Sequence, residues 1–131
     1  MLFRSVKYLQ QALALDPEGE TLLRPAHELR LDLARNLLII GSAAAAQREL
    51  ELLLETVPSK SRAIAYYQLG RARLAQGDSD GAEQAWQQAL EHDRTDANSL
   101  AALGELELHR HNVEAALQYL EVAVQDRKSV V

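Results

Sequence analysis

Apolar side chains recur along the chain at spacings of three and four residues, which places them on one face of an α-helix. The clearest stripe is formed by Tyr66, Leu69, Gly70 and Leu74. This pattern predicts helices at 6–15, 25–40, 43–56, 62–76, 79–92, 97–109 and 113–126. No segment alternates apolar and polar residues as a strand does. We therefore expect an all-α protein of about seven helices in a single domain over residues 1–131.

A second regularity is a period of 34 residues, over which small and apolar residues return. The landmark residues and their counterparts are Leu69 and Leu103, Gly70 and Gly104, Ala82 and Ala116, Trp86 and Leu120, and Ala89 and Ala123. Such a period is the signature of a repeat architecture. It divides the chain into repeats at about 27–60, 63–96 and 97–125, with the end of a further repeat at 6–17. Two extra residues are expected in the connection near 59–62.

The landmark residues have direct physical roles. A glycine in mid-helix costs about 1 kcal/mol relative to alanine, so Gly70 and Gly104 indicate that a neighbour approaches closely. The large ring of Trp86 fills volume left by small residues, and its indole N–H needs a partner. Turns are expected at 77–78 and 111–112, where Gly or Asn suits a left-handed residue and Asp or Asn suits a helix cap.

These residues resemble the tetratricopeptide repeat, a helix-turn-helix unit of 34 residues. The resemblance covers residues 6–125, and the best copy matches it at Tyr66, Leu69, Gly70, Gly77, Ala82, Trp86, Ala89 and Leu90. The chain departs from the pattern at Arg73 and Glu107, where an aromatic residue is usual, and at Arg94, where proline usually ends the second helix. The resemblance implies a right-handed α-solenoid of antiparallel helix pairs.

Composition excludes several classes of function. The chain has 14 Lys and Arg residues against 19 Asp and Glu, a net charge of −5, and no basic run, so no nucleic-acid partner is expected. Without cysteine there is no disulfide scaffold, no Cys-ligated zinc and no thiol nucleophile. The longest apolar stretch, 37–46, is about half a membrane span, so a soluble protein is expected. Its compartment stays open between the cytoplasm and periplasm of a bacterium.

Both ends of the chain resemble translated sequencing adapters, at residues 1–5 and 126–131. This resemblance predicts that these segments lie outside the domain and that the chain is a fragment of a longer protein. The alternative is an ordinary ragged terminus.

Candidate catalytic and metal-binding residues are few. His109 and His111 are two residues apart, which on a helix directs them about 200° away from each other, so we expect no metal site, even with Glu105 or Glu107 nearby. No phosphate-binding glycine loop and no serine nucleophile elbow occur. We therefore expect neither a cofactor nor catalysis.

By the resemblance, the first helix of each unit lines a concave groove with its second, fifth, ninth and twelfth residues. These are Glu28, Leu31, Arg35, Leu38, Ile64, Tyr67, Arg71, Leu74, Asn98, Ala101, Glu105 and Leu108. The expected partner-binding residues are Leu31, Arg35, Tyr67, Gln68, Arg71, Leu74, Asn98 and Glu105. The alternative interpretation places Leu38, Leu74 and Leu108 partly in the core and leaves both arginines solvated. The Lys and Asn clamp of chaperone-binding relatives is absent.

The sequence therefore favours a non-enzymatic scaffold that binds a peptide or helical segment of a partner protein in this groove. A second hypothesis is the regulatory arm of a larger enzyme, such as a glycosyltransferase or sulfotransferase. A third is self-association through exposed terminal helices, because neither end has the polar cap of a terminal repeat.

Overall fold

The computed structural model describes residues 2–17 and 25–129. Within these ranges the elements are α1 (Leu2–Leu15), α2 (Ala26–Ile39), α3 (Ala43–Thr56), a 3₁₀ turn (Ser59–Ser61), α4 (Arg62–Ala75), α5 (Ser79–His92), α6 (Ala97–His109) and α7 (Val113–Ser129). The described residues contain no strand, which confirms the all-α prediction.

The boundaries of the five inner helices agree with the prediction to within one residue. The terminal helices differ: α1 begins at Leu2 rather than near residue 6, and α7 continues to Ser129 rather than ending at 126. No glycine or proline interrupts either segment, so nothing in the sequence stops the helix there. The 3₁₀ turn lies where two extra residues were expected. The predicted linker residues 18–24 lie outside the described residues.

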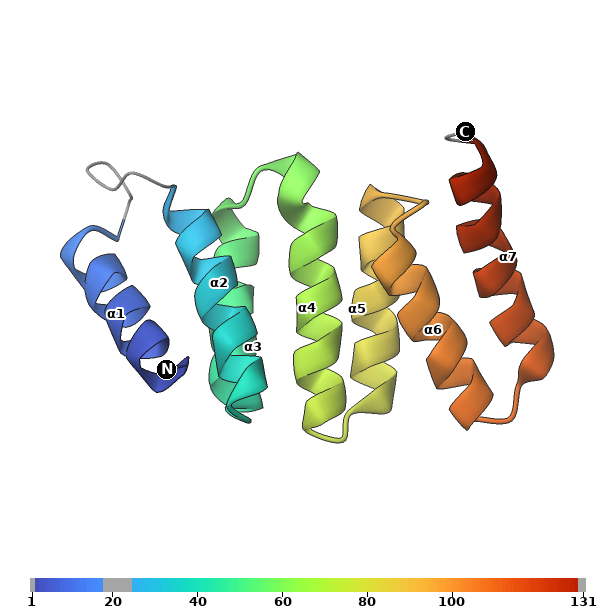
Figure 1. Cartoon of the computed structure of the whole chain (residues 1–131), viewed down its shortest axis with the longest axis horizontal. Coiled ribbons are helices and arrows are strands. Elements are labelled where there is room, and N and C mark those ends of the chain that lie inside the picture. The colour runs from blue at the N-terminus through green and yellow to red at the C-terminus, as the bar shows by residue number, and fades with distance from the viewer. Residues whose placement is uncertain (1, 18–24, 130–131) are drawn as a thin grey trace.

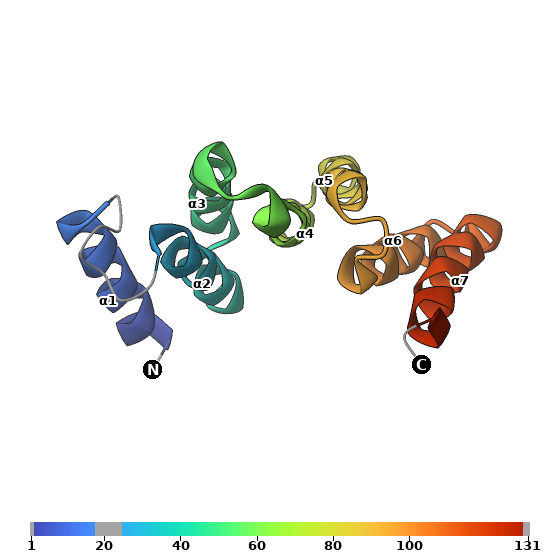
Figure 2. The same cartoon turned by 90° about the horizontal axis from the view of Figure 1, so that it is seen from above.

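The helices stand side by side in chain order, each packed against the next (Figure 1). Seen from above, α3 and α5 lie on one side of the row, and α2, α4 and α6 lie on the other (Figure 2). Both ends of the row bend toward the side of α2, α4 and α6, so this side is concave. The arrangement is the predicted α-solenoid of antiparallel helix pairs.

The turns inside the helix pairs follow the prediction with one difference. Gly77 has a φ of 85°, and the Asp78 carboxylate accepts a hydrogen bond of 2.9 Å from the backbone N–H of Gly81, capping α5. In the next pair the left-handed residue is His111, with a φ of 62°, rather than Asn112. Asn112 takes the position of Asp78, directly before α7, and its side-chain oxygen accepts a hydrogen bond of 3.4 Å from the backbone N–H of Ala115.

The core forms two clusters. The larger one runs from α1 to α5 and contains Val6, Leu9, Leu13, Leu29, Leu33, Ala34, Leu37, Ala46, Leu50, Leu53, Val57, Ala65, Leu69, Ala72 and Ala85. The smaller one joins α5 to α6 through Ala82, Trp86, Leu103 and Leu106. Ala82 and Ala116, which are one period apart, are both fully buried. The period in the sequence therefore reports packing between helices.

Candidate functional site

A hollow of about 450 Å³ lies between α4 and α6, on the concave side of the row. α4 and α6 are the first helices of two successive units, and α5 lies between them in the chain. The lining residues are Tyr67, Arg71, Leu74, Ser79, Trp86, Ala102, Glu105, Leu106 and His109. Four of the expected partner-binding residues, from two helices, therefore meet in one place.

The floor of the hollow is built around Trp86 of α5. Its indole N–H donates a hydrogen bond of 3.0 Å to the backbone carbonyl of Tyr67, so the expected partner of the indole is a main-chain group. The ring lies directly over Gly70, where an added Cβ would be 2.2 Å from the indole nitrogen. Only glycine fits at this position, and the packing fixes the ring as a buried apolar surface.

The two rims of the hollow carry opposite charges. Arg71 on α4 donates a hydrogen bond of 3.0 Å to the side-chain oxygen of Gln68. Glu105 on α6 is exposed, and its backbone carbonyl lies 2.8 Å from Nδ1 of His109. Neither the Arg71 guanidinium nor the Glu105 carboxylate forms an ion pair within the described residues. Both charges are thus available to a ligand.

The remaining expected partner-binding residues lie elsewhere. Leu31 lines a second hollow between α2 and the start of α4, together with Ile64. Arg35 lines a third hollow between α1 and α2 and lies 3.8 Å from Asp32. Gln68 is buried, and Asn98 is exposed at the start of α6 without lining any of these three hollows.

The alternative interpretation, in which Leu38, Leu74 and Leu108 belong partly to the core, fits the structure only for Leu38. Leu38 is half-buried and packs against the larger core cluster. Leu74 and Leu108 are 43% and 46% exposed, and Leu74 lines the hollow between α4 and α6.

Sequence reasoning missed the contribution of Ala102, Leu106, His109 and Ser79 to this hollow. The first three lie on α6 at the sixth, tenth and thirteenth positions of their unit. They face the preceding unit, whereas the positions taken from the resemblance describe one unit in isolation. A search for residues four apart on the side of α6 next to α4 would have found Ala102 and Leu106.

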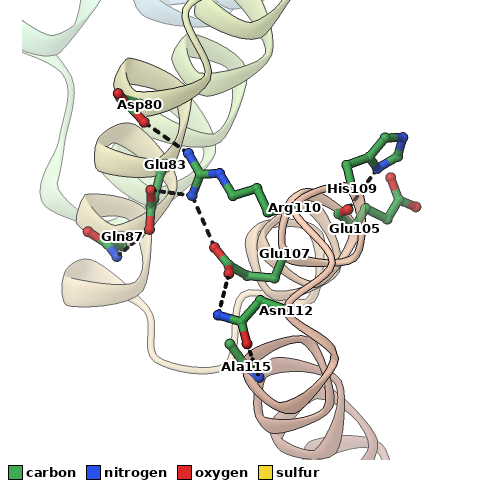
Figure 3. Close-up of polar contacts among 9 residues, drawn as sticks. All are labelled: Asp80, Glu83, Gln87, Glu105, Glu107, His109, Arg110, Asn112 and Ala115. Carbon is green, nitrogen blue, oxygen red and sulfur yellow. Dashed lines mark hydrogen bonds and ion pairs between the residues drawn. The ribbon is translucent and has the colours of Figure 1, made fainter.

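Behind the hollow, a polar network fastens the end of α6 to α5 (Figure 3). The Arg110 guanidinium donates to Glu83 at 2.7 Å and to Asp80 at 3.0 Å, both on α5. It also donates to Glu107 at 3.1 Å, and Glu107 accepts a further bond of 3.0 Å from Asn112. Glu107 stands where an aromatic residue is usual, and it is buried. Its carboxylate accepts hydrogen bonds from both Arg110 and Asn112, as a buried charged group requires.

The hydrogen bond that the Arg110 guanidinium donates to the Glu83 carboxylate raises the pKa of Arg110 above the already high value of an arginine. A base whose pKa is higher in the folded chain than in the unfolded chain stabilises the fold at every pH below its unfolded-state pKa. This stabilisation is lost only as the pH rises through its folded-state pKa. Arg110 is charged near neutrality with or without this shift, and its contacts with Asp80 and Glu83 connect the end of α6 to α5.

The four histidines do not form one site. His27 is half-buried at the start of α2 and lines the hollow between α2 and the start of α4. His92 stacks on Tyr66, with ring centroids 5.6 Å apart. His109 ends α6 and His111 lies in the following turn, both exposed. Among the described residues, no three His, Asp or Glu side chains are grouped so that they could hold a metal ion. No helix in the described part of the chain is long and apolar enough to cross a membrane.

Comparison with known proteins agrees with this architecture. Residues 63–96 match the family model of the tetratricopeptide repeat. A structure of MamA from Desulfovibrio magneticus RS-1 superimposes with a TM-score of 0.81 at 21% sequence identity, over 98% of this chain and 67% of that one. A structure of MamA MSR-1 gives a TM-score of 0.74 at 19% identity, over 98% and 69%. The comparison with curated proteins gave no match.

The fold and the hollow on its concave side define a helical-repeat protein. Residues 63–96, which cover nearly all of α4 and the whole of α5, match the tetratricopeptide repeat, and the chain as a whole shares the helical fold of the MamA structures.

Proposed function

We propose that the chain is a non-catalytic interaction scaffold that binds an extended or helical segment of a partner protein in its concave groove. The hollow between α4 and α6 is the main contact site in this proposal. The observation that carries it is the convergence of Tyr67, Arg71, Leu74 and Glu105 above the buried ring of Trp86. Tyrosine and arginine are enriched among interface residues that dominate binding energy.

The chemistry of the hollow indicates what a bound segment would contribute. The apolar floor formed by Trp86, Leu106 and Ala102 favours an apolar side chain of the partner. Arg71 on one rim and Glu105 on the other favour an acidic group and a basic group on either side of that side chain. A segment of this composition would satisfy both charges and cover the exposed part of Leu74.

A peptide-display experiment tests this proposal with the intact chain. A random dodecapeptide library is selected on the immobilised protein, and an enriched peptide is synthesised with a fluorescent label. Binding is then measured by fluorescence anisotropy. We expect the Tyr67→Ala, Arg71→Glu double variant to bind the peptide at least about tenfold more weakly, because it removes the aromatic wall of the hollow and reverses one charge.

The matched control is the Leu52→Ala, Arg48→Glu double variant, which truncates an exposed apolar side chain and reverses an exposed arginine on α3, outside the hollows described above. It should bind like the unaltered chain, and circular dichroism should show that both variants stay helical. Equal weakening of both variants, no effect of either, or a selection that enriches no peptide would reject the hollow as the binding site.

A further inference from the structure

The hollow between α4 and α6 has a neighbour of similar size. A hollow of about 420 Å³ lies between α2 and the start of α4, and its floor is formed by Leu53 and Val57 of α3. The first hollow is built in the same way, with α4 and α6 as walls and Trp86 of α5 at the floor. The α2–α4 hollow and the α4–α6 hollow, as they are named from here on, therefore lie on the concave side, on the two flanks of α4 (Figure 2).

The α2–α4 hollow is mostly apolar. Leu31 of α2 and Ile64 of α4 line it together with the buried floor. Ile64 is 41% exposed, so it offers apolar surface to a ligand. The acidic residues that line the two hollows, Glu28 and Glu105, lie on the far walls, α2 and α6. The wall that both hollows share, α4, contributes no acidic residue.

This shared wall is basic. Residues 58–77 contain Lys60, Arg62, Arg71 and Arg73 and no Asp or Glu, in a chain whose net charge is −5. None of these four side chains forms an ion pair within the described residues. Arg73 donates a hydrogen bond of 3.1 Å to a backbone carbonyl of α5, and Arg62 is half-buried. Lys60 and Arg71 are exposed, and each lines one of the two hollows.

On the basis of the proposed function, we propose that the partner segment is extended and acidic, and that it crosses α4 from one hollow to the other. Its two apolar side chains, one in each hollow, cover the exposed parts of Ile64 and Leu74. Its carboxylate lies over α4, in the positive potential of Lys60 and Arg71. The α2–α4 hollow thereby becomes a second part of the binding site.

The distance between the hollows sets the spacing of the two apolar side chains. Ser61 and Ile64 line one hollow and residues 67–74 of α4 line the other, so the two sets are centred about eight residues, or about 12 Å, apart along α4. The hollows flank a helix about 10 Å wide, which brings their separation to about 15 Å. This distance corresponds to about four or five residues of an extended chain, but to about ten residues of an α-helix.

An extended chain fits this path and fixes the order of its residues. Its backbone carbonyls are free to accept hydrogen bonds from Lys60 and Arg71, whereas a helix has already paired its own. In an extended chain, residues four apart point to the same side, and so does the residue midway between them. The predicted pattern is therefore an apolar residue, any residue, an acidic residue, any residue and an apolar residue.

Synthetic peptides test this pattern on the intact chain. The probe is fluorescein-labelled Gly-Ser-Leu-Ser-Asp-Ser-Leu-Ser-Gly, and fluorescence anisotropy measures its binding at an ionic strength of about 0.15 M, where charges act over about 8 Å. One comparison peptide has Lys in place of Asp. The other, Gly-Ser-Leu-Asp-Ser-Ser-Leu-Ser-Gly, has the same composition, but its carboxylate points to the other side of an extended chain. We expect the probe to bind about threefold more tightly than either, or better, although the net charge of the chain would favour the Lys peptide.

Two variants test the α2–α4 hollow. Ile64→Asn introduces the residue that the next repeat has at this position, and Lys60→Glu reverses an exposed charge. Each should weaken binding of the probe at least about threefold, and Lys60→Glu should also reduce the preference for Asp over Lys. The matched controls are Leu52→Asn and Arg94→Glu, at exposed residues outside both hollows, and they should bind like the unaltered chain. Circular dichroism checks that all four variants fold.

The outcomes separate this proposal from the proposed function. If the Tyr67→Ala, Arg71→Glu variant weakens binding of the probe while Ile64→Asn and Lys60→Glu do not, the proposed function stands and the crossing of α4 is wrong. Equal binding of the three peptides would overturn the acidic pattern, and tighter binding of a helical peptide with leucines about three turns apart would overturn the extended one. No binding of the probe to the unaltered chain would overturn the crossing as well, while the library selection still decides the proposed function.

Discussion

At the scale of single residues, two glycines at the same position of consecutive repeats have different neighbours. A Cβ added at Gly70 would lie 2.2 Å from the indole nitrogen of Trp86, which is held by its hydrogen bond to a backbone carbonyl. A Cβ added at Gly104 would lie 3.1 Å from the side chain of Leu120, which is a flexible contact. The requirement for glycine is therefore steric at Gly70 and weak at Gly104.

This difference predicts opposite results for the same substitution. Gly70→Ala should lower the free energy of unfolding by about 1–3 kcal/mol, because the fixed ring must move. Gly104→Ala should leave it unchanged or raise it by up to about 1 kcal/mol, because alanine favours the helix and the leucine can shift. Urea denaturation of both variants measures the two values. Equal losses would show that the rigidity of the tryptophan does not decide the effect.

At the scale of helices, the Arg110 network is the polar connection between α5 and α6. Glu107 is only 7% exposed, so it depends on Arg110 and Asn112 for its hydrogen bonds. The contacts of Arg110 with Asp80 are solvent-exposed and contribute little. The stabilising part of the network is therefore the pair of Arg110 with the buried Glu107 and the half-buried Glu83.

We expect Arg110→Met to lower the free energy of unfolding by about 1 kcal/mol or slightly more, because it leaves a buried carboxylate with one donor fewer. Glu107→Met should also destabilise the protein. The double variant should lose less than the sum of both, because each single change leaves the other charge without its partner. Thermal and urea unfolding measure this cycle. Arg48→Met, at an exposed arginine of α3, is the control and should change stability by less than about 0.5 kcal/mol.

The helices were predictable because their signals are local. Spacings of three and four residues and the Gly77–Asp78 turn marked their boundaries, and the period indicated the solenoid. The hollow was only partly predictable: Tyr67, Arg71, Leu74 and Glu105 followed from the resemblance. Which residues of α6 line the hollow depends on the distance between two successive units, and the residue pattern within one unit does not determine that distance.

At the scale of the whole molecule, the chain has one continuous core from α1 to α5 and a smaller cluster that joins α6 and α7 to it. α3 and α4 are joined within the larger cluster, whereas α5 and α6 are joined only by the four buried residues of the smaller one, so the junction beside the hollow is the weaker one. In a solenoid, the free energy of unfolding is approximately the sum of the intrinsic stabilities of the repeats and of the interaction energies between neighbouring repeats. The small cluster between α5 and α6 thus stabilises the last repeat less than the larger core stabilises α1 to α5.

We therefore expect α6 and α7 to open before the core helices unfold. In native-state hydrogen exchange, amides of α6 and α7 should exchange with a lower free energy of opening than those of α3 and α4. Arg110→Met should lower the opening energy of α6 and α7 further and leave α3 and α4 unchanged, because the residue acts only at the junction with α5. Identical opening energies throughout α3 to α7 would mean that the chain unfolds as one unit, and the small cluster would then be as strong a junction as the larger core.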